Sequence, residues 1–277
     1  MRNVVIFVFA LCVLAPLAAQ PVSSATGSKK LPARVPFVGC RSDGQTGPVE
    51  APSGESKPVP IAAETAQRLA YYHAEQGPGV LAPRGWYCFG TYGSNGEVLY
   101  ISPQPIDATS LLSPQGAGFT GPVIEFAHMV GDTSGRFSVA RTIARVFPAH
   151  RAFVSKVAAE GIWPADAFPS GPYPQDKLTY KSKEMVEYQT PAQTEGLGTN
   201  SRLLKNSSPI SGVAILVGEP PDLLFLSMRL PLDLGGLAAA IIRQVERDAA
   251  RPVTSRGSAA PMPGPTIQSP REDRSQR

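Results

Sequence analysis

The sequence predicts an α+β domain in which helices pack on a mostly antiparallel sheet and one disulfide bond pins two strands together. Three observations support this fold class. Residues 209–246 have the pattern of a buried β-hairpin followed by an amphipathic helix. A second hairpin pattern is centred on residues 94–96. Two cysteines, Cys40 and Cys88, remain once a signal-like N-terminal segment is set aside.

The stretch 209–246 carries the strongest structural signal. Two short apolar runs, 210–217 and 223–228, are separated by a Gly-Glu-Pro-Pro-Asp turn, and its prolines cannot donate to a sheet ladder. The following apolar residues fall at i, i+3, i+4, i+7 and i+11, which is one face of a helix. They are Leu234, Leu237, Ala238, Ile241 and Val245, with Asp233 as the predicted N-cap.

The first half of the chain predicts a strand, a loop, a helix and a hairpin, in that order. These are a strand over 35–40, a loop over 41–60, a helix over 61–76, and strands over 85–92 and 97–102. The helix is predicted because Ala62, Ala66, Leu69 and His73 share a helical face. The hairpin is predicted because Asn95-Gly96 tolerates the positive φ of a tight turn.

The middle of the chain predicts further elements that lead up to residue 209. These are a loop over 103–121, a strand over 123–130, helices over 135–147 and 148–160, an edge strand over 177–188 and a polar loop over 190–208. Ile124, Phe126 and His128 alternate onto one face of the strand. Asp132 or Thr133 is expected to cap the helix that follows.

The ends of the chain differ from the predicted domain. Residues 1–25 have a basic start and a short apolar segment followed by small residues, which predicts a secretory signal cleaved after Ala19 or Ala25. Cys12 is expected to leave with it, with a lipid anchor as the alternative. A linker over 26–34, one domain over 35–250 and a disordered basic tail over 251–277 follow. We therefore expect a periplasmic or extracellular protein with no transmembrane segment after the signal.

The remaining cysteines predict a disulfide bond between Cys40 and Cys88. In an oxidising compartment a lone pair of cysteines is most simply bridged. If both thiols stay free, Cys88 beside a histidine is a candidate nucleophile instead.

The charge distribution argues against a specific nucleic-acid partner. The chain has a net charge of +4, but Arg2, Lys29, Lys30 and Arg34 carry +4 before the domain, and the segment from Arg251 onward carries +3. Residues 35–250 therefore have a net charge of −3, so the basic excess lies in the ends and not on a folded surface.

Two glycine-rich motifs are poor matches to catalytic or cofactor sites. Gly116–Gly121 spells G-x-G-x-x-G, but a loop precedes it and a strand pattern follows, so no helix N-terminus is in place for a pyrophosphate. Gly131–Gly135 resembles the segment around a serine-protease nucleophile but has one residue too many. The sequence predicts no cofactor.

The three histidines, His73, His128 and His150, all lie on predicted apolar faces. Their spacing is not a local metal-ligand pattern, so we expect satisfied core or boundary histidines and no metal site.

The loop over 190–208 is the best candidate for ligand binding, because a long polar loop in a compact domain is often functional. Its hydrogen-bonding candidates are Glu195, Asn200, Arg202 and Lys205. An ordinary surface loop is the alternative.

Three segments together carry a resemblance. Phe37–Cys40, Gly85–Gly90 and Thr194–Thr199 resemble secreted bacterial proteins of unknown function, over most of residues 35–246. The resemblance implies secretion and implies no activity or site residue.

The sequence thus leaves three hypotheses. The first is a non-catalytic exported protein that binds a small ligand or an envelope partner. The second is a secreted hydrolase whose site assembles from distant residues, with Cys88, a histidine and the 190–208 loop as candidates. The third is an envelope structural protein that uses its basic tails.

Overall fold

The computed structural model describes residues 32–112 and 118–251. The predicted signal segment and most of the predicted linker and basic tail lie outside these residues. The prediction of a single domain over 35–250 stays a prediction.

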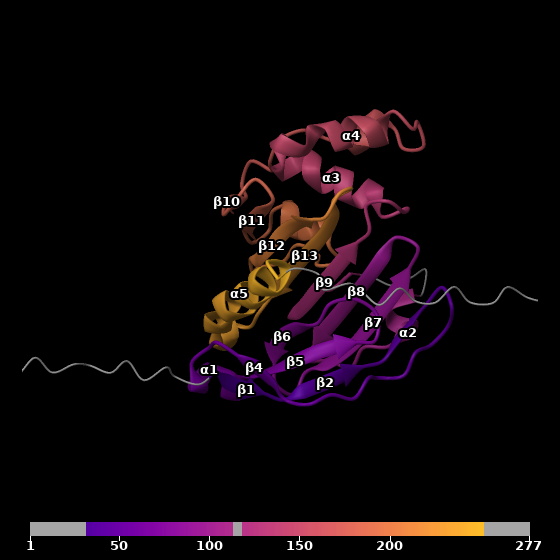
Figure 1. Cartoon of the computed structure of the whole chain (residues 1–277). Helices are drawn as coiled ribbons and strands as arrows, with labels where there is room; N and C mark the ends of the chain where they lie inside the picture. The colour runs from indigo at the N-terminus through magenta and orange to yellow at the C-terminus, as the bar shows by residue number, and fades with distance from the viewer. Residues whose placement is uncertain (1–31, 113–117, 252–277) are drawn as a thin grey trace, which may run out of the picture. The chain divides into compact units, whose positions relative to one another are not determined.

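Most strands belong to one eight-stranded sheet (Figure 1). They are β3 (Ser42–Gly44), β7 (Tyr87–Gly93), β8 (Gly96–Ser102), β9 (Val123–Met129), β10 (Lys177–Tyr180), β11 (Met185–Thr190), β12 (Ile210–Val217) and β13 (Asp222–Arg229). Their order across the sheet is β10-β11-β12-β13-β9-β8-β7-β3. Every neighbouring pair is antiparallel except β3 and β7.

Two smaller sheets complete the strand content. One pairs β1 (Ala33–Val35) with β4 (Lys57–Val59). The other holds β2 (Phe37–Cys40), β5 (Leu69–Ala74) and β6 (Val80–Pro83), with β5 in the middle. The α+β class with a mostly antiparallel sheet is confirmed.

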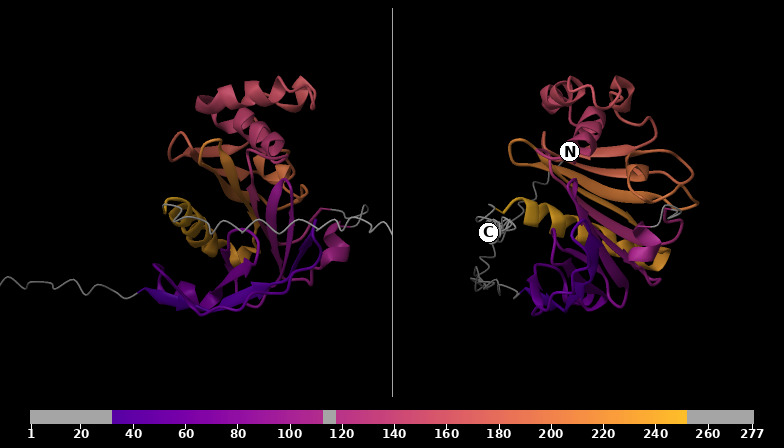
Figure 2. Two further views of the ribbon diagram at one scale, coloured as in Figure 1. Left: turned by 45° about the vertical axis from the view of Figure 1, so that its right-hand side comes forward. Right: turned by 90° about the vertical axis from the view of Figure 1, so that its right-hand side faces the viewer.

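Helices cover both faces of the main sheet. They are α1 (Ala63–Arg68), α2 (Ala108–Leu112), α3 (Arg136–Val146), α4 (Arg151–Ala158) and α5 (Ala238–Ala249). One core joins α3 to Ala127, Ala214, Leu223 and Phe225 on one face. Another core joins α5 and the β2-β5-β6 sheet to the opposite face. Both views of Figure 2 show α3 and α4 on the side of the sheet away from the indigo N-terminal strands.

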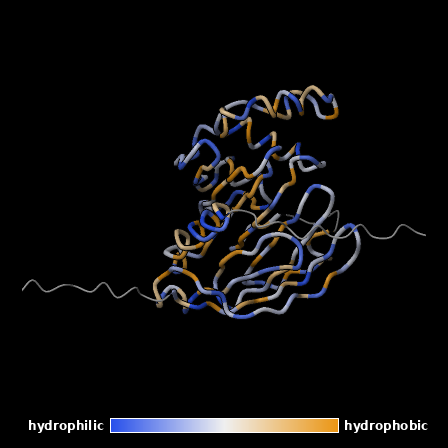
Figure 3. The backbone as a smooth tube through the Cα atoms, in the orientation of Figure 1, coloured by the Kyte–Doolittle hydropathy of each residue, from blue (hydrophilic) through white to orange (hydrophobic). Residues whose placement is uncertain are grey.

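The predicted hairpin and helix of residues 209–246 form the centre of this arrangement. Strands β12 and β13 pair antiparallel, and they are buried on both faces because α3 covers one face and α5 the other. The hydrophobic stretches drawn in orange in Figure 3 run along these central strands. Buried apolar residues on both faces explain the nearly unbroken apolar runs in the sequence.

The predicted helix over 61–76 is wrong after residue 68. Helix α1 ends at Arg68, and residues 69–74 form strand β5, which pairs with β2 on one side and β6 on the other. Tyr72 is fully buried, and its hydroxyl donates to the carbonyl of Pro83 at 2.8 Å. A short apolar segment with aromatic residues fits both the helical and the strand periodicity. Hydrogen bonding along both edges makes residues 69–74 a strand.

Other predicted boundaries also need correction. The loop over 41–60 contains β3 and β4, the loop over 103–121 contains α2, and the strand over 177–188 is the pair β10 and β11. The linker ends early, because residues 33–35 form β1. Short strands of this kind carry too few residues for a periodic signal.

The predicted helix caps are wrong as well. Helix α3 has Gly135 as its N-cap without a side-chain cap bond, although the hydroxyl of Thr133 accepts from the Gly135 N–H at 3.2 Å. Asp233 lies inside a 3₁₀ segment, η4 (Leu232–Leu237), that leads into α5. That 3₁₀ segment positions the first turn of α5, so no side-chain cap is made there.

The predicted disulfide bond between Cys40 and Cys88 is confirmed. It joins the end of β2 to β7, and therefore ties the small sheet to the main sheet. The bridge is consistent with an exported protein.

Candidate functional site

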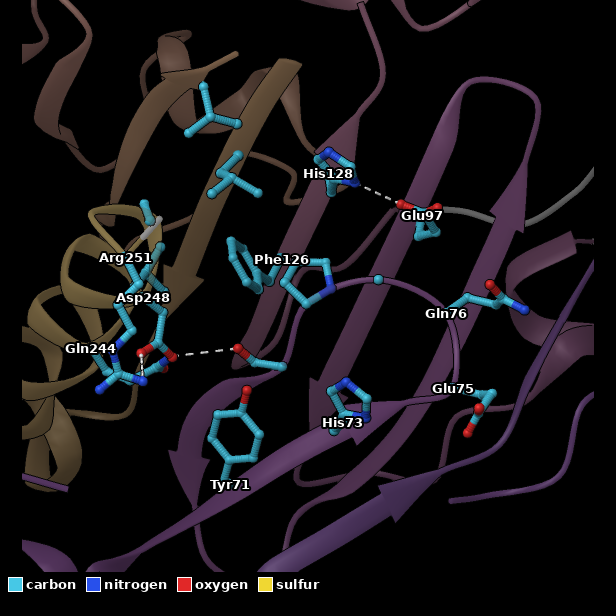
Figure 4. A pocket seen from close by; sticks show the side chains of 17 residues that line it. Tyr71, His73, Glu75, Gln76, Glu97, Phe126, His128, Gln244, Asp248 and Arg251 are labelled. Carbon is cyan, nitrogen blue, oxygen red and sulfur yellow. Dashed lines mark hydrogen bonds and ion pairs between the residues drawn. The ribbon is translucent and has the colours of Figure 1, made fainter. Parts of the chain in front are cut away.

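A cleft of about 600 Å³ opens between α5, the β5–β6 turn and one face of the main sheet. We call it the α5 cleft. Its apolar lining is Phe126, Val217, Leu224 and Val245, and its polar lining includes Glu75, Gln76, Glu97, Gln244, Asp248 and Arg251. Figure 4 shows side chains of β5, β8, β9 and α5 around the cleft, among them Tyr71, Glu97, Phe126 and Gln244. The volume is within the usual range for small-molecule sites.

His128 lies at the inner end of the cleft between two carboxylates. Its Nδ1 is 2.8 Å from Oε2 of Glu97, and its Nε2 is 3.3 Å from Oδ2 of Asp222. Glu97 is the direct cross-strand partner of His128 in the β8–β9 register. The other oxygen of Asp222 accepts the N–H of Gly131 at 2.8 Å. The two ring nitrogens of His128 thereby link β9 to β8 and to β13.

The wall formed by β5 is aromatic. The rings of Tyr71 and His73 are stacked, with centroids 6.3 Å apart. Lys57 places its ammonium 3.5 Å from the centre of the Tyr71 ring. Burial is the main cause that lowers the pKa of His73, and the nearby Lys57 lowers it further. Burial also raises the pKa of Tyr71. Both side chains are therefore uncharged at neutral pH.

The C-terminal end of α5 supplies the opposite wall. Gln244 is buried, and its Oε1 accepts the N–H of Leu81 at 2.8 Å, so that α5 is fastened to β6. Its amide donates to Asp248 at 2.5 Å. Asp248 also pairs with Arg251 at 3.3 Å and lies 3.9 Å from Lys57. The charge of Asp248 is thus compensated by the protein.

The remaining charges make the cleft acidic. Its lining holds the three carboxyl groups of Glu75, Glu97 and Asp248 and one guanidinium, that of Arg251. Arg251 is already paired with Asp248, and Glu75 is exposed at the mouth of the cleft. Glu97 is paired with His128, so Glu75 is the lining carboxylate for which the described residues offer no ion pair. An apolar interior with an acidic lining is suited to an organic cation. Among the described residues, no group of three or more His, Cys, Asp or Glu side chains is arranged to hold a metal ion.

The candidate residues of the 190–208 loop divide into two places. Glu195 and Lys205 pair with each other at 2.7 Å on the surface. Asn200 and Arg202 line a second, smaller cavity on the opposite face of the main sheet. The structure therefore does not bring the four residues together, and the α5 cleft contains none of them.

The residues of the α5 cleft were not predicted as a site. His73 and His128 were expected to be core or boundary residues, and His73 was placed on a helix that is in fact strand β5. One signal in the sequence could have indicated the site: His128 is a polar residue on a strand face that is otherwise apolar, beside Ile124 and Phe126. Asp222 and Glu97 could not be associated with His128 without the strand order β13-β9-β8.

No known protein family matches the chain, and neither does any curated protein or solved structure. Within residues 32–112 and 118–251, no helix is long and apolar enough to cross a membrane.

Proposed function

We propose that the chain is a non-catalytic ligand-binding protein that acts in the periplasm or outside the cell. Its ligand is a small organic cation with an apolar body, held in the α5 cleft. The observation that carries this proposal is the combination of an apolar interior with a lining that holds three carboxyl groups and one guanidinium. The Cys40–Cys88 bridge supports the compartment.

The contacts around His128 favour binding over hydrolysis. Both ring nitrogens are directed at carboxylates, so neither is aimed at a molecule in the cleft. A general base needs a nitrogen within reach of the proton that it removes. The alternative nucleophile, Cys88, is bonded to Cys40 and has no thiol to offer. These two observations support binding over the hydrolase mechanism that the sequence suggests for Cys88.

The proposed charge preference is tested with two ligands of similar size and opposite charge. We expect 2-phenylethylammonium to bind the purified mature protein in isothermal titration calorimetry. We expect 3-phenylpropionate to bind at least about tenfold more weakly, since a buried like charge costs well over 1 kcal/mol. Equal affinity for the two ligands would contradict the proposal.

Residue substitutions place the binding in the α5 cleft. The double variant Glu75→Gln and Glu97→Gln is expected to weaken 2-phenylethylammonium binding by about 10- to 100-fold, because hydrogen bonds to charged groups contribute roughly 1.5–3 kcal/mol. Glu184→Gln makes the same chemical change between β10 and β11, outside the cleft lining, and is expected to leave the affinity unchanged. An equal loss in both variants would show that general charge, and not the cleft, governs binding.

A further inference from the structure

A second cavity, of about 390 Å³, lies on the face of the main sheet opposite the α5 cleft. We call it the Glu125 cavity. Strands β7, β8 and β9 form its floor through residues that include Thr91, Tyr100 and Glu125. Asn200, Ser201 and Arg202, from the loop that the sequence marked for ligand binding, close its side.

Glu125 is a buried carboxyl group whose hydrogen bonding is incomplete. The residue is only 6% exposed, and its Oε2 accepts the backbone N–H of Arg202 at 2.8 Å. This is the hydrogen bond to the Glu125 carboxyl group found among the described residues, and it leaves Oε1 as an acceptor. Glu125 lines the cavity, and Oε1 is not one of the fully enclosed side-chain atoms without a partner, so a hydroxyl group in the cavity can donate to it.

The position of Glu125 follows from the sheet register. Tyr100 on β8 is its direct partner on one side, and Ser227 on β13 is its partner on the other. Ser227 is fully buried and hydrogen bonds to the hydroxyl of Tyr188 at 2.6 Å. Glu125 is thus one member of a polar row that crosses an otherwise apolar sheet face.

The environment of Glu125 makes its charge responsive near neutral pH. Burial raises the pKa of Glu125 to about 7, although the N–H and the positive charge of Arg202 act in the opposite direction. The titratable groups that face it are Arg202 from the loop, Tyr100 and Tyr92 from β8 and β7, and Tyr188 from β11. Burial raises the pKa of Tyr100 and of Tyr188, so both phenols stay neutral.

The polar groups of the Glu125 cavity suit a neutral ligand that both donates and accepts hydrogen bonds. Its lining contains one carboxyl group, Glu125, and one guanidinium, Arg202, so its charges balance. Tyr100 interacts with the side chains of Arg202 and Thr91, which gives a connected set of hydroxyl and charged groups. The amide oxygen of Asn200 is fixed by the Tyr173 hydroxyl at 2.8 Å, whereas its nitrogen has no partner among the described residues.

We propose that the Glu125 cavity is a second binding site, and that it takes a neutral polyhydroxylated molecule of monosaccharide size. Hydroxyl groups of such a ligand donate to Oε1 of Glu125 and accept from the amide nitrogen of Asn200. The site is separate from the α5 cleft, which has an excess of acid and lies on the other face of the sheet.

The proposal is tested by titrating the mature protein with D-glucose, D-galactose, D-mannose, D-ribose and myo-inositol, with binding followed by NMR. At least one is expected to bind saturably and to shift amide resonances of residues 200–202. Binding is expected to be up to about tenfold tighter at pH 8 than at pH 6, because a carboxylate accepts a stronger hydrogen bond than a carboxylic acid. No binding by any of the five compounds would overturn the proposal.

The variant Glu125→Gln keeps the shape of the side chain and removes its titration. It is expected to weaken binding at pH 8 about tenfold and to abolish the difference between pH 6 and pH 8. Glu184→Gln makes the same change outside both cavities and is expected to leave saccharide binding unchanged. If saccharide binding to Glu125→Gln still depends on pH, another group is responsible and the assignment to Glu125 is wrong.

The pH dependence of the melting temperature tests whether Glu125→Gln still folds. A carboxyl group whose pKa is raised by folding binds more protons in the folded state, so it stabilises the fold below its pKa. The melting temperature of the unsubstituted protein is therefore expected to fall as the pH rises from 5 to 8. In Glu125→Gln this decrease is expected to be smaller, and the variant is expected to be at least as stable at pH 8.

Discussion

Replacement of both Cys40 and Cys88 by alanine is expected to lower the free energy of unfolding by roughly 4 kcal/mol. The bridge closes a loop with a sequence separation of 48, and removing it restores chain entropy to the unfolded state. Cys40 ends β2 in the small sheet, and Cys88 lies in β7 of the main sheet. Without the bridge, the covalent link between the small sheet and the main sheet is missing. Urea denaturation followed by circular dichroism measures the decrease in the free energy of unfolding.

The control for this prediction is reduction of the unsubstituted protein. Dithiothreitol is expected to shift the urea midpoint of the unsubstituted protein to that of the double alanine variant, and to leave the variant itself unchanged. A midpoint of the unsubstituted protein that does not respond to dithiothreitol would show that the bridge contributes little to stability. Alanine is preferred to serine because Cys40 is 1% exposed, and a buried hydroxyl group adds a cost of its own.

The sequence predicts those parts of the fold whose signal is local. The hairpin and helix of 209–246 are recognised because long apolar runs and a 3.6-residue period need no partner to be seen. The turn at Gly96, where φ is +129°, is recognised from its residue type. Strand β5 is missed because its identity is decided by hydrogen bonds to the following strand β6 and to β2, which lies about 30 residues earlier in the chain.

The candidate sites depend on strand order, which the sequence does not carry. His128 meets Glu97 and Asp222 because β9 lies between β8 and β13. Glu125, three residues earlier on the same strand, faces the other side of the sheet and meets Arg202. The alternation of a strand separates these two residues into different sites. The loop carrying Arg202 was recognised as a candidate for binding, but its partner Glu125 was not.

Arg229→Met is expected to lower the free energy of unfolding by about 3 kcal/mol, because hydrogen bonds to a buried charged group are worth roughly 1.5–3 kcal/mol each and are not additive. Arg229 is 2% exposed at the end of β13. Its guanidinium donates to the carbonyl groups of Phe119, Thr120 and Gly121 at 3.2–3.4 Å. It also donates to the carbonyl group of Leu204.

The buried charge of Arg229 has a cost that works against this loss. Burial lowers its pKa, and its Nε has no partner among the described residues. Methionine removes that cost and keeps much of the volume, but it leaves the carbonyl groups without a donor. Thr120, Gly121 and Leu204 are exposed and can turn to water, so the penalty rests mainly on Phe119. We therefore expect a net loss, smaller than the sum of the four bonds.

Arg229→Lys tests whether the forked shape of the guanidinium, and not only its charge, stabilises the fold. Arg229→Lys keeps the charge, but one ammonium cannot reach the carbonyl groups of both segments in a fork. The free energy of unfolding of Arg229→Lys is expected to lie between that of the unsubstituted protein and that of Arg229→Met. If Arg229→Lys is as stable as the unsubstituted protein, the charge alone suffices and the fork is not needed.

Hydrogen exchange locates the effect of Arg229→Met. The Phe119 N–H donates to the carbonyl of Arg202 at 2.7 Å, and the Leu204 N–H donates to the carbonyl of Phe119 at 2.9 Å. Both amides are expected to lose protection before the amides of β12 and β13 do, because the guanidinium fastens these loops to the sheet. The same bonds hold Arg202 beside Glu125, so Arg229→Met is also expected to weaken ligand binding in the Glu125 cavity.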